Sequence, residues 1–165
     1  MMDFNSSSSI SGQVTTLVDT GLQQARARQS ERQYLGASRL GVACERALQF
    51  EYAKASIDHG RDIPGRMLRI FERGHVMEDC MVAWLRDAGF DLRTRKADGE
   101  QFGFSVADGR LQGHIDGVIV GGPDGFAYPA LWESKCLGNK SWRELEKSRL
   151  AVAKPVYAAQ VAIYQ

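Results

Sequence analysis

This chain has two apolar, β-prone segments, and each has an acidic residue within it or directly after it. Asp116 lies within one such run, and Glu133 directly follows another as part of the sequence Glu133-Ser134-Lys135. Successive side chains of a strand point to opposite faces, so Glu133 and Lys135 share one face while Ser134 points away. If the two segments pair, we expect the three charged groups to converge at one place on a β-sheet.

The residue types at this place favour a metal site. Carboxylate oxygens are the ligands that hard divalent cations such as Mg²⁺ prefer, and buried carboxylates need a partner or a metal. We therefore predict that Asp116 and Glu133 bind one or two Mg²⁺ ions, with the carbonyl of Ser134 as a further ligand. Lys135 would orient a metal-bound water or contact a scissile phosphate, which indicates metal-assisted hydrolysis of a phosphodiester. A simple salt bridge from Lys135 to one acid is the alternative, and both can hold without metal.

Bulk properties exclude several classes of protein. The 165 residues, 44% hydrophobic and 25% charged, suit one ordinary globular domain. No apolar run reaches the length of a membrane span, and no signal-peptide pattern is present. The three cysteines are too widely spaced to indicate a disulfide framework or a zinc motif. We expect a cytoplasmic protein without membrane contact.

The net charge of +1 gives no general signal for nucleic acid, so any basic footprint must be local. Basic residues concentrate in two windows: Arg26, Arg28, Arg32, Arg39 and Arg46, then Lys135, Lys140, Arg143, Lys147 and Arg149. A solvated helix face accounts for such charge as well as a DNA-facing surface does.

The pattern along the chain predicts a polar N-terminal arm over residues 1–30, with a flexible start that includes Ser6 to Ser9 and leads into a helical part. A domain is expected over residues 31–165. Helices are expected at 38–55 with Ser38 as N-cap, at 67–88 before Gly89, from Trp142, and at 156–165 after Pro155. Strands are expected at 90–95, 101–106, 111–120 and 130–136, with a hairpin turn at Asp108-Gly109. The pattern stops within the last helix, so we expect a fragment, or a domain without its final strand.

Two polar residues lie on the otherwise apolar side of the predicted helix 67–88. Glu78 follows His75 by three residues, so both can project from one face. A carboxylate on an apolar face needs a reason, and we predict Glu78 as a metal ligand. His75 is a second candidate ligand, with a satisfied core histidine as the alternative.

The order of these residues, continued by Gln160-x-x-x-Tyr164, resembles that of the PD-(D/E)XK nuclease superfamily. The chain is most similar to RecB-type nuclease domains and to the lambda exonuclease and YqaJ group. Three segments carry further similarity: residues 34–46, with Ser38-Arg39 and Cys44-x-Arg46, residues 73–78, with a glycine-then-acid pattern, and residues 155–164, with the glutamine-tyrosine helix. No piece is specific alone, but five pieces in this order are persuasive.

The resemblance implies an α/β fold of restriction-endonuclease type, with a mixed sheet flanked by helices. It also implies dependence on Mg²⁺ or Mn²⁺ and cleavage of DNA. Gln160 would line the active site and Tyr164 would position substrate, although an interior amide and a core aromatic are alternatives for the pair. Ser38, Arg39 and Arg46 would contact the DNA, mainly its phosphates, which positions substrate without reading sequence.

The sequence departs from the family pattern in two places. Sixteen residues separate Asp116 from Glu133, and the strand expected after the glutamine-tyrosine helix is missing. We predict a Mg²⁺-dependent DNA exonuclease of recombination or repair, with a phage source as one option, acting as a homo-oligomer or with a recombination partner protein. The alternatives are a non-cleaving nucleic-acid-binding or assembly module on the same fold, and a hydrolase of other phosphate esters.

Overall fold

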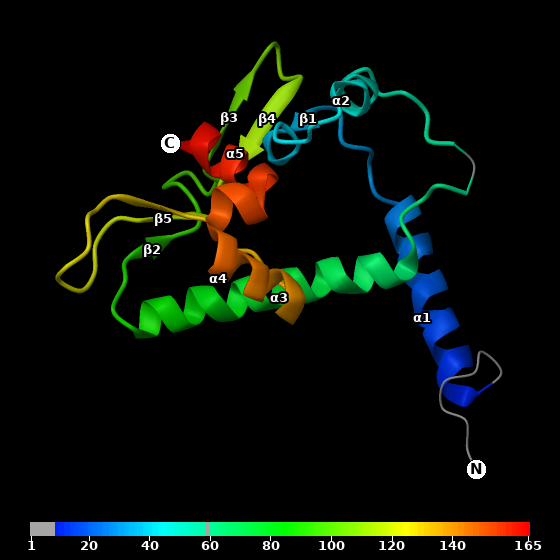
Figure 1. Ribbon diagram of the computed structural model, residues 1–165, viewed down its shortest axis with the longest axis horizontal. Helices are drawn as coiled ribbons and strands as arrows, with labels where there is room; N and C mark the ends of the chain where they lie inside the picture. Colours follow the sequence, from blue (N-terminus) through cyan, green and yellow to red (C-terminus); the bar gives the residue numbers. More distant parts are fainter. Residues whose placement is uncertain (1–8, 59) are drawn as a thin grey trace. The chain divides into compact units, whose positions relative to one another are not determined.

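A computed structural model describes residues 9–58 and 60–165 (Figure 1). Within these residues the chain forms five α-helices, one short 3₁₀ helix and six strands, which confirms the predicted α/β class. The predicted flexible start at residues 1–8 lies outside the described residues. No helix in the described part is both long enough and apolar enough to cross a lipid bilayer.

The chain divides into two units rather than at residue 30. Of the described residues, the first unit comprises 9–31, 56–58 and 60–76, and the second comprises 32–55 and 77–165. The helical part of the predicted arm is present as a helix over Ile10–Ala27, and this helix packs against a segment that is distant in sequence. The predicted domain over 31–165 correspondingly loses residues 56–76 to the first unit.

The first unit consists of α1 (Ile10–Ala27) and the beginning of α3 (Gly65–Asp87). The hydroxyl of Ser9 caps α1 by accepting a hydrogen bond from the backbone of Gly12 at 3.0 Å. The two helices meet at Asp19 and Gly65, where a Cβ on the glycine would lie only 2.4 Å from the Cβ of Asp19. Nearby, Arg69 Nε lies 2.8 Å from Asp19 Oδ1.

The second unit contains two three-stranded sheets in place of the single mixed sheet expected. The first sheet has the order β1-β4-β3, with β1 parallel and β3 antiparallel to β4; its strands are β1 (Leu35–Gly36), β4 (Leu111–His114) and β3 (Gly103–Val106). The second is antiparallel with the order β2-β5-β6; its strands are β2 (Leu92–Arg93), β5 (Gly117–Ile119) and β6 (Ala130–Trp132).

The predicted strand 111–120 is broken into β4 and β5, which belong to different sheets. At the break, the backbone N–H of Ile115 donates to the carbonyl of Phe102, which directly precedes β3, and the side chain of Asp116 accepts from the backbone N–H of Ser134 beyond β6. Ile115 and Asp116 thus form hydrogen bonds to different parts of the chain, which explains why β4 and β5 do not form one continuous strand.

The predicted helix 38–55 is wrong in its first half. Ser38 lies within the 3₁₀ helix η1 (Ala37–Arg39), and only α2 (Glu45–Tyr52) is α-helical. Gly41 between them approaches α5 so closely that a Cβ would lie 2.6 Å from the Cα of Val156. This tertiary contact fixes an irregular connector where the apolar spacing alone favours a helix.

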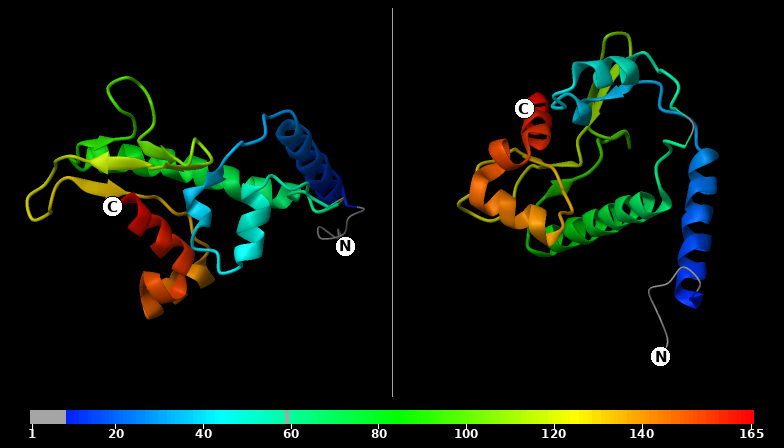
Figure 2. Two further views of the ribbon diagram at one scale, coloured as in Figure 1. Left: turned by 90° about the horizontal axis from the view of Figure 1, so that it is seen from above. Right: turned by 45° about the vertical axis from the view of Figure 1, so that its right-hand side comes forward.

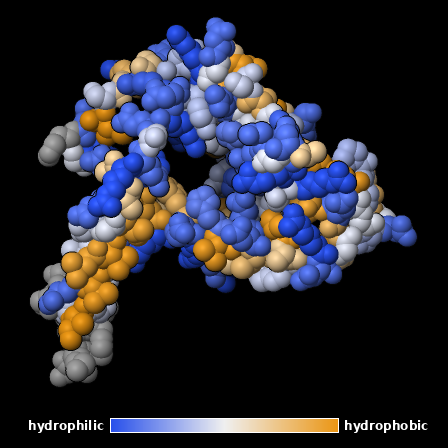
Figure 3. Space-filling view, turned by 180° about the vertical axis from the view of Figure 1, so that it is seen from behind, coloured by the Kyte–Doolittle hydropathy of each residue, from blue (hydrophilic) through white to orange (hydrophobic). Residues whose placement is uncertain are grey.

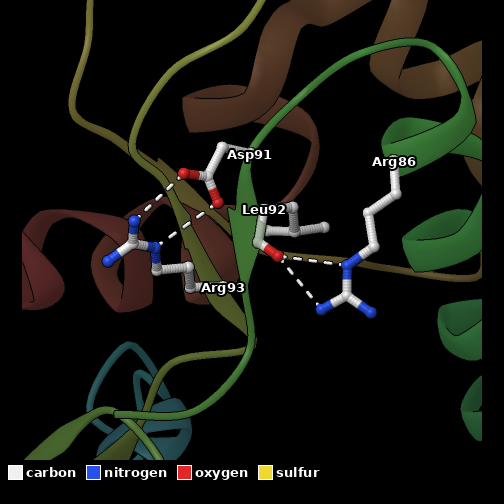
Figure 4. A network of polar contacts seen from close by, with 4 residues as sticks. All are labelled: Arg86, Asp91, Leu92 and Arg93. Carbon is white, nitrogen blue, oxygen red and sulfur yellow. Dashed lines mark hydrogen bonds and ion pairs between the residues drawn. The ribbon is translucent and has the colours of Figure 1, made fainter. Parts of the chain in front are cut away.

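The predicted helix 67–88 is confirmed as α3, which ends before Gly89 with its left-handed φ of 89°. Figure 4 shows how the helix end is joined to β2. The guanidinium of Arg86 donates to the carbonyl of Leu92 at 3.0 and 3.1 Å, while Arg93 pairs with Asp91 at 3.0 Å. These bonds place the helix end beside the second sheet.

The last two helices are α4 (Asn139–Ala153), interrupted at Arg149, and α5 (Pro155–Tyr164). Figures 1 and 2 show the sharp turn between them, from orange into red. Lys154 at this turn donates to Ser141 and Glu144 of α4. Helix α5 covers β4, since a Cβ on Gly113 would lie 2.7 Å from the ring of Tyr164.

Candidate active site

The two apolar segments pair as predicted, and their acids meet at one end of the hairpin. Strands β5 and β6 are antiparallel with Gly117 opposite Trp132, so Asp116 and Glu133 are the next residues outward on each strand. The backbone N–H of Ser134 donates to Asp116 Oδ2 at 2.8 Å and joins the two strand ends. The sixteen intervening residues therefore do not separate the acids.

Glu133 is the most enclosed acid of this group, with 8% of its side chain exposed. Its Oε1 accepts hydrogen bonds from Lys135 Nζ and, at 2.7 Å, from Gln160 Nε2. Its Oε2 is buried and has no hydrogen-bond partner among the described residues. A buried carboxylate oxygen without a donor is costly, so this position favours an additional cationic or hydrogen-bonding ligand.

The electrostatics of the site also favour a bound cation beside Glu133. Burial raises the pKa of Glu133 above its ordinary value, and the negative charges of Asp116 and Glu78 raise it further, while the bond and charge of Lys135 oppose the shift. The net shift is upward, so the single ammonium does not compensate for burial and for the two neighbouring acids. A bound cation would relieve this excess of negative charge.

Lys135 is held on two sides. Its Nζ contacts Glu133 and lies 5.6 Å from the ring centroid of Tyr157 on α5. The ion pair that we gave as an alternative is therefore present. The sequence analysis missed Tyr157, although its position three residues before Gln160 places both on one face of a helix.

Gln160 is 4% exposed and links the acid to α5. Its Nε2 donates to Glu133 and to the hydroxyl of Tyr164, the latter at 3.3 Å. The ring of Tyr164 packs edge-on against Phe104 with centroids 6.1 Å apart. Burial raises the pKa of Tyr164, and the charge of Glu133 adds to the shift. In the structure Tyr164 thus supports Gln160, and its predicted contact with substrate stays a prediction.

The two candidate ligands on α3 differ in their surroundings. Glu78 is half-buried in the second unit, and its charge acts on Glu133. His75 is exposed and belongs to the first unit, one helical turn earlier. The structure brings Glu78 into the electrostatic field of the site and gives no such role to His75.

Of the three residues predicted to bind DNA phosphates, Ser38 and Arg39 lie in η1 and Arg46 lies in the first turn of α2. Arg39 forms a forked ion pair with Glu51 at 2.6 to 3.1 Å, and these bonds raise the pKa of Arg39. Ser38 is half-buried in η1, and the exposed Arg46 stacks over Phe50 at 5.3 Å. A phosphate at Arg39 would have to compete with the internal carboxylate.

The donor chemistry of the site fits a hard divalent cation, although its ligand set is open. No three His, Cys, Asp or Glu side chains among residues 9–58 and 60–165 are grouped so that they could hold a metal ion. Yet Asp116 and Glu133 are both oxygen donors, and one buried oxygen of Glu133 lacks a partner. These residues would form the centre of a metal site that needs a further ligand.

We compared the chain with known protein families, with curated proteins and with solved structures, and found no match. The similarity to the PD-(D/E)XK superfamily therefore rests on the order of its motifs, and the chemistry rests on the site described above.

Proposed function

We propose that this chain is a Mg²⁺-dependent DNA nuclease, also served by Mn²⁺, and that it acts as an exonuclease in recombination or repair. The observation that supports this proposal most is the buried, unpartnered oxygen of Glu133, beside two acids whose charges raise its pKa. A buried structural carboxylate usually has both oxygens satisfied. Asp19 Oδ1 also lacks a hydrogen bond, but it lies 2.8 Å from Arg69 Nε in an ion pair, whereas the ion pair of Glu133 is at its other oxygen. In a carboxylate that binds a cation, one oxygen is expected to lack a hydrogen bond when the cation is absent.

In this proposal Asp116 and Glu133 hold the ion, Glu78 completes the acidic set, and the carbonyl of Ser134 is a further ligand. When bound, the ion supplies a water of lowered pKa and positive charge for the phosphate. The N–H of Ser134 fixes the carboxylate of Asp116, and Gln160 fixes that of Glu133, so both acids are oriented before a ligand arrives.

Lys135 acts on the substrate side of the reaction. With a cation held by the acids, the Lys135 ammonium would be free to turn from Glu133 to the attacking water or to a phosphate oxygen. The ring of Tyr157 limits the directions that it can take. The water oxygen would form a bond to phosphorus and lose one proton to solvent, one bridging P–O bond would break, and the departing oxygen would take up a proton.

The DNA itself would be held through its phosphates by Ser38, Arg39 and Arg46, with Arg39 exchanging Glu51 for a phosphate. Such contacts carry no sequence information and weaken with salt. We therefore expect cleavage that is tolerant of sequence and sensitive to ionic strength.

The test is degradation of end-labelled linear DNA beside a covalently closed circle, in Mg²⁺, Mn²⁺ and EDTA. We expect loss of the linear DNA alone, abolished by EDTA and by Lys135→Ala. Lys96→Ala, at an exposed lysine in the turn between β2 and β3, is the matched control and should remain active. Cutting of the circle would make the protein an endonuclease. A folded protein that cuts neither substrate would refute the proposal.

One observation favours a second candidate, a nucleic-acid-binding module that does not cleave. The described side chains do not form a closed group of three metal ligands. That candidate predicts DNA binding that is unchanged by EDTA, no cleavage with either metal, and no effect of Lys135→Ala beyond a small loss of affinity.

A further inference from the structure

Helix α1 carries an uncovered apolar stripe. Four of its large apolar side chains are exposed: Ile10 by 81%, Val14 by 52%, Leu17 by 72% and Val18 by 45%. At about 100° per residue they lie on one side of the helix, together with Gly21 and Ala25, within a band roughly 100° wide. Figure 3 shows this band on α1 as an almost unbroken orange strip at the lower left.

The opposite side of α1 is the one that the first unit uses. Asp19 contacts Gly65 and Arg69, and Gln23 donates to the carbonyl of Ile63 at 3.3 Å. No residue of α1 is buried. Within the described residues of the first unit, the stripe is thus left over after the packing against α3, and it is wide enough to require a partner.

We propose that this stripe is a dimerisation surface on which α1 pairs antiparallel with α1 of a second copy of the chain. The two-fold axis passes between Leu17 and Val18. In such an interface the same surface serves both copies, so each contact occurs twice.

The positions of the stripe have the symmetry that this pairing needs. The six residues are spaced by 4, 3, 1, 3 and 4 positions, so the stripe reads the same from either end; they are Ile10, Val14, Leu17, Val18, Gly21 and Ala25. Antiparallel pairing about the midpoint sets Ile10 against Ala25 and Val14 against Gly21. The large residues of one helix then meet the small residues of the other, whereas parallel pairing would place glycine on glycine and leave gaps.

Charge also favours a second copy in this orientation. Between residues 10 and 25 the only charged side chain is Asp19, which is paired with Arg69 on the far side of the helix. The stripe and its borders are thus neutral and do not repel an identical surface. The basic residues Arg26 and Arg28 follow at one end. Antiparallel pairing keeps the two basic ends about 27 Å apart, the length of an 18-residue helix, while parallel pairing would bring them together.

The first experiment measures the mass of the full chain in solution by light scattering and sedimentation over a range of concentrations. We expect the mass of two 18.3 kDa chains. Leu17→Glu should give a monomer with unchanged helix content. Val152→Glu is the matched control, because Val152 is 76% exposed on α4 and lies outside the stripe, and this variant should stay dimeric.

A second variant tests the register. Among residues 9–58 and 60–165, nothing outside the backbone of its own helix lies within 4 Å of a Cβ placed on Gly21, so Gly21→Leu should leave the monomer intact. If the stripe were merely sticky, the added apolar surface would strengthen association. In the proposed register the new side chain collides with Val14 of the other copy, and the dimer should become roughly tenfold weaker.

Cysteine cross-linking fixes the orientation. In a chain with Cys44, Cys80 and Cys136 replaced, Val18→Cys lies near the two-fold axis and should cross-link to itself, whereas Ala25→Cys should not. Cross-linking at both positions would overturn the antiparallel arrangement. A wild-type protein that is monomeric at every concentration, or a Leu17→Glu variant that stays dimeric, would overturn the proposed dimer. A monomeric wild type is also the result expected if another part of the same chain, a lipid surface or another protein covers the stripe.

Discussion

Helices α5 and α1 use apolar residues in opposite ways. Helix α5 is apolar nearly throughout, is covered by η1 and β4, and buries one polar side chain, Gln160, to 4% exposure. Helix α1 is mixed in composition, buries none of its residues and leaves four large apolar side chains exposed. A polar group enclosed among apolar ones indicates a chemical task, whereas an apolar face left in water indicates a missing partner. This contrast is the reason that we propose chemistry for the region around α5 and assembly for α1.

The sharpest way to break this contrast is to make the same change in both regions. Asp116→Asn removes a charged metal ligand, so DNA cleavage should fall roughly 10²–10³-fold. Asp19→Asn makes the same replacement in the first unit, where it weakens the partly buried ion pair with Arg69, and it should leave cleavage unchanged. Cleavage rates of linear DNA and thermal unfolding check both. Equal losses of activity would show that the chemistry is not confined to the second unit.

The next largest effect concerns the buried amide. Gln160→Leu removes the donor that orients Glu133, and we expect cleavage to fall roughly 10–100-fold, with more Mg²⁺ needed for half-maximal rate. Gln23→Leu in α1 removes only an exposed hydrogen bond to Ile63 and should change neither quantity. A Mg²⁺ titration of the initial rate separates loss of orientation from loss of fold. An unchanged Mg²⁺ requirement would contradict the positioning role.

Substitutions at two glycines compare the effect of an added methyl group on the stability of α5 and of α1. A Cβ on Gly41 would lie 2.6 Å from the Cα of Val156, so Gly41→Ala must displace α5 and should cost about 1–3 kcal/mol. The described part of a single chain leaves open space around the Cβ position of Gly21. In the Leu17→Glu background, which removes the proposed dimer contact, Gly21→Ala should stabilise α1 by up to about 1 kcal/mol through helix propensity. Urea unfolding, combined with hydrogen exchange of α1 and α5, measures both. The prediction is wrong if the two changes have the same sign.

The smallest effect is the pH dependence of the metal-free protein. The pKa of Glu133 is raised in the folded state above its ordinary value of 4.5. Its protonated form therefore contributes stability that is fully present below 4.5 and is lost as the pH rises through the folded pKa. Unfolding free energies measured in EDTA above pH 4.5 should decline with pH, and Glu133→Gln should flatten that decline. Added Mg²⁺ should raise the unfolding free energy again at the higher pH values. In the control variant Asp19→Asn, the unfolding free energy should still decline with pH.

Much of the fold could be predicted where the signal is local. The long periodic run before Gly89 predicts α3, and the Asp108-Gly109 turn predicts the β3–β4 hairpin, where Asp108 adopts a left-handed φ of 52°. The helix predicted from Ser38 failed because the contact of Gly41 with α5 joins residues far apart in sequence. Local patterns do not contain such contacts.

The main residues of the candidate site could also be predicted from the sequence, but some of their contacts could not. The order of the acids, the lysine and the glutamine placed Asp116, Glu133, Lys135 and Gln160 in one group, and the structure brings them together. The ring of Tyr157 beside Lys135 depends on how α5 packs, so spacing alone did not reveal it. The internal pairing of Arg39 with Glu51 likewise depends on the turn between η1 and α2.

The hairpin of β5 and β6 has one further consequence, for engineering. Its two acids lie at one end, and residues 120–129 close the other end. Apart from the adjacent residues, no described residue lies within 4 Å of a Cβ placed on Gly121 or Gly125. Insertions at exposed loop tips are well tolerated. This loop is therefore a place to insert an affinity tag, a fluorophore or a fused domain, so that the protein can be tethered or observed with its acidic end intact.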